Sequence, residues 1–155
     1  MVVALVLVLV AATTWWWSSA DDRRVDAACG DWLAQRPDLR NLVDVTEEAA
    51  GRAAGDGAGT VTEEFGGLVE PRSWTTRWDE SAPRIIGSLD NDDGRDETTA
   101  EEGLYFYLVM VDEQLDFLQV TIADNDLQAL PWEIDEARSR FQGVDDICLS
   151  AARGD

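Results

Sequence analysis

Leu-Tyr-Phe-Tyr-Leu-Val-Met-Val, residues 104–111, is the stretch that decides the expected fold. Apolar and aromatic side chains fill it without interruption, which is typical of a strand that is central in a sheet or buried on both faces. Asp112, Glu113 and Gln114 follow as a predicted turn, and residues 115–123 return as a second strand. The sequence therefore predicts an antiparallel hairpin at the centre of a small sheet.

Segments on both sides of this hairpin complete the expected fold. Apolar residues recur with helical spacing at positions 25–33 and 39–43, separated by Pro37, and Asp44 with Glu47 resembles a capping box that opens another helix. A last helix is expected to begin near Pro131 and to end at Gly143. Four more candidate strands are residues 60–62, 67–70, 72–78 and 84–89. The order of helices, strand meander and helix predicts an α+β fold with an antiparallel sheet and a C-terminal helix.

The first twenty residues carry no charged side chain, and residues 1–12 are uninterrupted apolar sequence. One interpretation is a signal peptide, with an apolar region over residues 2–12 and small residues, Ser18 and Ala20, before the cleavage point. The other is a transmembrane anchor over residues 2–17, whose three tryptophans lie at the headgroup level. A buried core segment is the third alternative. We expect an anchor or signal segment at residues 1–20 and a single acidic domain at residues 21–155.

Charge and missing residue types narrow the classes of function. The formal net charge is −20, and the chain has no His and no Lys. Such a charge repels nucleic acids and favours a basic protein as partner. The composition excludes the usual Ser-His-Asp and Cys-His catalysis, a lysine Schiff base, and zinc sites that contain His. The composition therefore favours a non-catalytic role over a catalytic one.

Cys29 and Cys148 are the two cysteines of the chain. In an oxidising compartment they are expected to form one disulfide that ties the first helix to the C-terminal segment. The alternative is a pair of buried free thiols.

An acidic stretch at residues 90–97 is the first candidate ligand site. Its carboxylates surround Gly94, and calcium prefers six to eight oxygen ligands of this kind. The spacing departs from an EF-hand, because Leu89 and Ala100 occupy the first and last ligand positions. A solvated acidic loop is the alternative. The candidate ligands are Asp90, Asp92, Asp93 and Asp96.

Trp74 and Trp78 form the second candidate ligand site. On one face of the expected strand, their rings would provide a platform on which a carbohydrate could stack. Nearby carboxylates would then supply the acid pair of a glycoside hydrolase. The alternative is that both tryptophans belong to the core. The carboxylates considered are Glu63, Glu64, Asp79 and Glu80.

These features together predict a non-catalytic extracytoplasmic domain, membrane-tethered or secreted, that acts through protein contacts. A calcium- or carbohydrate-binding module is the first alternative. An enzyme that uses carboxylates or an oxygen-bound metal is the second. A cytosolic acidic inhibitor of a basic protein is the third.

Overall fold

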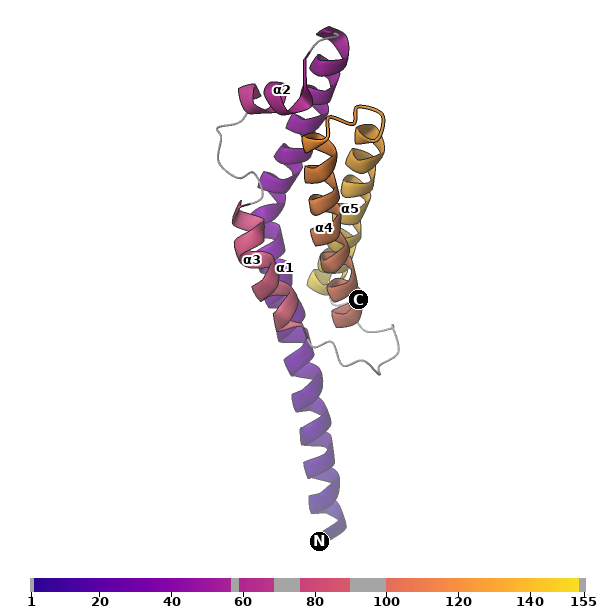
Figure 1. The fold of residues 1–155 in the computed structure, drawn as a ribbon. Helices are drawn as coiled ribbons and strands as arrows, with labels where there is room; N and C mark the ends of the chain where they lie inside the picture. Colours follow the sequence, from indigo (N-terminus) through magenta and orange to yellow (C-terminus); the bar gives the residue numbers. More distant parts are fainter. Residues whose placement is uncertain (1, 57–58, 69–75, 90–99, 154–155) are drawn as a thin grey trace.

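The computed structural model describes residues 2–56, 59–68, 76–89 and 100–153, with side chains from residue 23 onward except those of Asp56 and Thr76. Its elements are α1 (Val2–Asp56), α2 (Val61–Leu68), α3 (Thr76–Ser88), α4 (Ala100–Ala123) and α5 (Leu130–Arg153). α1 contacts each of the other four helices. Figure 1 shows α4 and α5 on one side of α1, with α2 and α3 on the other. The N-terminal part of α1 projects beyond this bundle (Figure 1).

The prediction of an α+β fold is wrong, because no strand occurs among the described residues. The expected hairpin, with its two strands and its turn at Asp112, Glu113 and Gln114, lies entirely within α4. Residues 84–88 belong to α3, and residues 61–62 and 67–68 belong to α2. Residues 69–75 lie outside the described ranges.

The cause of the error is that α4 is apolar on two opposite faces. Its core face repeats with helical spacing through six buried residues, Leu104, Leu108, Val111, Leu115, Leu118 and Ile122. On the opposite face Phe106, Phe117 and Val120 are exposed by 57%, 61% and 58%. A helix with apolar residues all round loses its amphipathic signature, and its sequence then looks like a strand buried on both sides.

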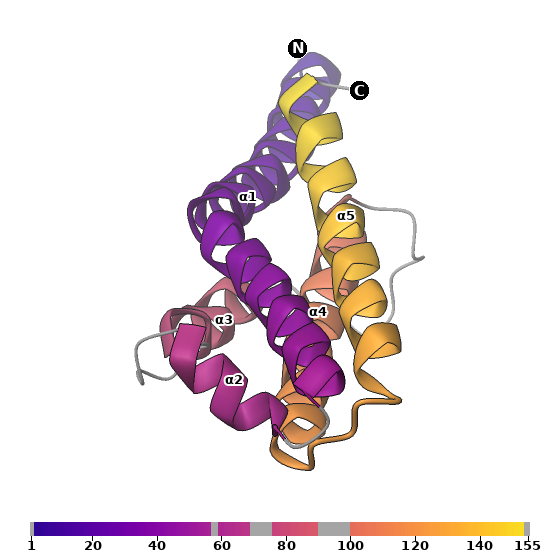
Figure 2. The ribbon, with the colours of Figure 1, turned by 90° about the horizontal axis from the view of Figure 1, so that it is seen from above.

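α1 continues through every feature expected to interrupt it. Pro37, Asp44 and Glu47 all lie inside the helix, so the predicted breaks are wrong. A proline inside a helix removes one hydrogen bond and bends the axis, and Figure 2 shows α1 changing direction along its length. Burial on both sides of Pro37, by Trp32 and Leu39 among others, holds the helix together.

The same continuity corrects the expectation of a separate apolar helix at the N-terminus. α1 is one element of 55 residues, and it crosses the expected division between residues 20 and 21 without a break. Within the part of the chain that the structure describes, no helix is long and apolar enough to cross a membrane.

α5 begins as predicted, with Leu130 as its first residue and Pro131 in the first turn. The predicted end at Gly143 is wrong, because the helix continues to Arg153. Gly143 instead allows a close approach of α4: a Cβ at this position would overlap with the ring of Tyr107. This glycine therefore serves helix packing, and Ala at the same place would force either the Tyr107 ring or the two helices to shift.

Three buried aromatic side chains join α1, α3 and α5 in the core. The ring centroid of Trp32 lies 6.0 Å from that of Trp78 and 5.6 Å from that of Phe141, and both pairs are edge to face. Such pairs add to the stabilisation from burial. The predicted inward positions on the first helix, Val25, Ala28, Cys29 and Trp32, are confirmed as buried, whereas Leu33 is 46% exposed.

Candidate functional site

A disulfide joins α1 to α5 and confirms the predicted pairing of Cys29 with Cys148. The two cysteines are separated by 119 residues, and their Cα atoms lie 5.4 Å apart. Both are buried. The bridge closes nearly the whole described domain into one covalent loop, with α2, α3 and α4 inside it.

Asp145 lies less than one turn before Cys148 and receives three donors from α1. The indole Nε1 of Trp32 donates to Oδ1 of Asp145 over 2.9 Å. Arg36 and Arg40 pair with its Oδ2 over 2.8 and 2.9 Å. Because residues 32, 36 and 40 are four apart, they share one face of α1. One buried carboxylate on α5 thus fixes three successive turns of α1 beside the disulfide.

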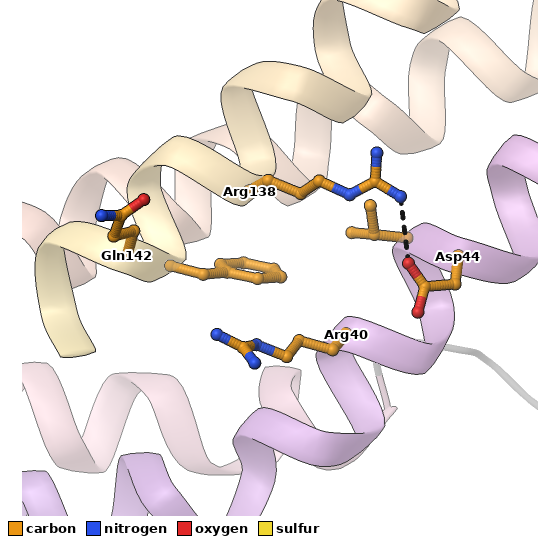
Figure 3. A pocket seen from close by; sticks show the side chains of 6 residues that line it. Arg40, Asp44, Arg138 and Gln142 are labelled. Carbon is orange, nitrogen blue, oxygen red and sulfur yellow. Dashed lines mark hydrogen bonds and ion pairs between the residues drawn. The ribbon is translucent and has the colours of Figure 1, made fainter.

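A pocket of about 350 Å³ lies next to this junction (Figure 3). Its lining comes from α1 and α5 and consists of Arg40, Val43, Asp44, Arg138, Phe141 and Gln142. Arg138 Nη2 lies 3.0 Å from Asp44 Oδ1 and 2.5 Å from Glu47 Oε2. These carboxylates, Glu47 foremost, raise the pKa of Arg138 above its ordinary value. Arg40 shares Asp145 with Arg36, and Arg138 pairs with two carboxylates. Both guanidinium groups at the pocket therefore already have acidic partners within the chain, which argues against an anion site.

A second hollow, of about 320 Å³, opens between α4 and α5 on the exposed side of the bundle. We call it the α4–α5 groove. It is lined by Met110, Glu113, Gln114 and Phe117 from α4 and by Trp132, Glu133, Glu136 and Arg140 from α5. Trp132 is 63% exposed and Phe117 61%, so the groove has large aromatic walls that face solvent.

The charges of the groove are unbalanced. Arg140 pairs with Glu136, and its Nη1 donates to the sulfur of Met110. Glu133 is buried, and its carboxylate accepts a 2.6 Å hydrogen bond from the neutral amide of Gln114. Among the described residues, no arginine pairs with Glu133 or with the exposed Glu113. The groove therefore carries an excess of two negative charges beside aromatic rings.

The groove continues along α4 as an exposed stripe. Phe106, Met110, Glu113, Phe117 and Val120 follow one another at intervals of four, three, four and three residues. This is the spacing of the contact positions in a coiled coil. We call these five residues the α4 stripe. Sequence reasoning missed it because the strand interpretation hid it, although the spacing itself could have revealed it.

Of the six predicted ligand residues, the structure describes Trp78 alone. Asp90, Asp92, Asp93, Asp96 and Trp74 lie outside the described residues. Trp78 is 2% exposed, so its ring has no open face on which a sugar could stack. Glu63 and Glu64 lie on α2, whereas Asp79 and Glu80 lie on α3. Across the described ranges, no three potential metal ligands come together.

Asp112 is the partner of the buried Trp78, whose Nε1 donates to its Oδ1 over 2.8 Å. Burial raises the pKa of Asp112 above its ordinary value, and the nearby carboxylates of Asp116, Asp79 and Glu113 add to this effect. The folded state then holds this proton more tightly than the unfolded state does. Stability from this group is consequently greatest at acid pH and falls as the pH rises from about 4 through the folded pKa.

Asp112→Asn should therefore stabilise the protein at neutral pH. The amide oxygen still accepts from Trp78, while the charge and its repulsion disappear. We expect the free energy of unfolding to rise by up to about 0.5 kcal/mol at pH 7, because solvent screens much of the charge repulsion. Below about pH 4 we expect no increase. Urea unfolding of both proteins at pH 7 and pH 3.5 measures the difference. An equal loss of stability at both pH values would show that the hydrogen bond, and not the charge, dominates.

Comparisons of this chain with protein-family models, with curated proteins and with solved structures find no match. The case for function consequently rests on the residues described above.

Proposed function

We propose that this chain is a non-catalytic domain that acts outside the cytoplasm through contacts with other proteins. The observation that carries the proposal is the disulfide between Cys29 and Cys148. Cytosolic proteins are kept reduced, whereas exported domains of this size commonly rely on such bridges. Both cysteines are buried between helices, so the bridge serves the domain itself and does not link it to another chain.

Composition and surface support the same proposal. The absence of His and Lys removes the commonest acid–base and nucleophilic residues. Large exposed apolar side chains on α4 and α5, Phe106, Phe117, Val120 and Trp132, are typical of a protein-contact surface. The proposal includes two routes out of the cytoplasm. The apolar residues 2–17 either contact a membrane and retain the domain there, or are removed with cleavage after Ala20.

Fractionation of the native cells, combined with thiol trapping and N-terminal sequencing, tests this proposal. We expect the protein outside the cytoplasm, with Cys29 and Cys148 unreactive toward maleimide until a reductant is added. Asp21 as first residue would indicate release, and an intact N-terminus in the membrane fraction would indicate retention. A cytosolic protein with two reactive thiols would overturn the proposal.

A further inference from the structure

The α4 stripe is a helix face that no other helix of the described residues covers. It lies opposite the buried face of α4, and three of its residues are more than half exposed. From Phe106 to Val120 it extends about 21 Å, or roughly four helical turns. The alternating three- and four-residue spacing matches the contact face of a second helix packed alongside.

Glu113 lies at the middle of this apolar stripe and determines what can dock there. A charged residue at a contact position selects a partner of the opposite charge. Phe117 and Trp132 stand beside it in the α4–α5 groove, together with Glu133. A cation in this groove would meet two carboxylates with which no arginine of the described ranges pairs. It would also meet two aromatic faces, which attract cations in their own right.

A second copy of this chain is a poor occupant of the stripe. Glu113 lies seven residues from each end of the stripe, so a two-fold pair, parallel or antiparallel, brings the two Glu113 carboxylates together. Each chain also has a formal net charge of −20. Both effects oppose self-association. Anionic lipid headgroups are disfavoured for the same reason.

We propose that the α4 stripe and the α4–α5 groove bind one basic amphipathic helix of another protein. Its apolar side chains cover Phe106, Phe117 and Val120, and one Arg or Lys enters the groove to meet Glu113 and Glu133. This inference rests on the proposed function, since it names the surface and the partner chemistry of a protein-contact domain. It extends the expectation of a basic partner from net charge to particular residues.

A designed peptide provides the test. The probe is a fluorescent 21-residue helical peptide with Leu at the contact positions and Arg at the one that faces Glu113. A matched peptide carries Glu in place of that Arg. Fluorescence anisotropy with the full oxidised chain measures the affinity of each. We expect the Arg peptide to bind at least ~10-fold more tightly than the Glu peptide, as the loss of a central contact usually costs that much.

Variants of the chain locate the binding. Phe117→Ala should lower the affinity for the Arg peptide at least ~10-fold. Glu113→Arg should make the chain bind the Glu peptide more tightly than the Arg peptide. Leu33→Ala and Asp26→Asn, at exposed positions on α1, are the matched controls and should leave both affinities unchanged. Circular dichroism of each variant verifies that it folds. Rescue of the Glu peptide by Glu113→Arg cannot arise from misfolding.

Several results would overturn the inference. The inference is wrong if neither peptide binds, if both bind equally well, or if Phe117→Ala does not change the binding. A stable dimer in sedimentation equilibrium that Phe117→Ala dissociates would assign the stripe to a second copy instead. If the peptides do not bind but the protein is exported with its disulfide formed, the proposed function stands, and only the assignment of the α4 stripe as the contact surface is wrong.

Discussion

Replacing Cys29 and Cys148 together by alanine is expected to lower the free energy of unfolding by about 2–5 kcal/mol. The upper end follows from loop-closure entropy, because the bridge spans a sequence separation of 119 residues and its loss frees the unfolded chain. Alanine avoids leaving a hydroxyl group at two buried positions. Small domains are stable by only about 5–15 kcal/mol, so the loss is a large part of the total.

Urea unfolding of the oxidised protein and of the double variant measures this loss. Reduced wild-type protein should match the variant, and the reductant should not change the variant further. The slope of free energy against urea should also increase without the bridge, because the unfolded state becomes more extended. Equal stability of the two oxidised proteins would mean that the helix contacts around the bridge hold α1 and α5 together unaided.

The sequence predicted parts of α1 and α5 as helix, whereas it predicted strands for the segments that form α2, α3 and α4. Val25, Ala28, Cys29 and Trp32 repeat with a clear helical period, and Leu130 with Pro131 marks the start of α5. α4 was misjudged because Leu104, Leu108 and Val111 alternate along the chain with exposed Phe106 and half-buried residues of similar hydrophobicity. Local propensity toward strand was then overridden by packing against α5, a contact that sequence alone does not show.

The candidate site was predictable only in part, for a related reason. The disulfide followed from the number of cysteines and the expected compartment. The α4–α5 groove did not, because it needs Glu113 and Trp132 on neighbouring helices, and the hairpin interpretation put Glu113 in a turn. Asp145 was likewise missed, because the last helix was predicted to end at Gly143. The spacing could have revealed it, since Asp145 lies four residues after Phe141 and three before Cys148 on the buried face, whereas Asp146 is exposed.

Asp145→Ala is expected to lower the free energy of unfolding by about 2–4 kcal/mol. It leaves the buried indole N–H of Trp32 without an acceptor and leaves Arg36 and Arg40 without their shared carboxylate. The cost falls short of that for a fully buried ion pair, because the side chains of Arg36 and Arg40 are 29% and 51% exposed. Thermal and urea unfolding of the oxidised protein measure it.

A double-mutant cycle separates the indole contact from the charges. Asp145→Asn keeps an oxygen that can accept from Trp32 but removes the negative charge, whereas Trp32→Phe removes the donor and keeps an aromatic ring between Trp78 and Phe141. With Asp145→Ala and Trp32→Phe as the two changes, we expect a coupling energy of about 1 kcal/mol. The loss of stability caused by Asp145→Asn alone should then come mainly from the ion pairs with Arg36 and Arg40. A coupling energy near zero would mean that Trp32 stabilises the α1–α5 junction through packing alone, and the hydrogen bond to Asp145 would have no independent role.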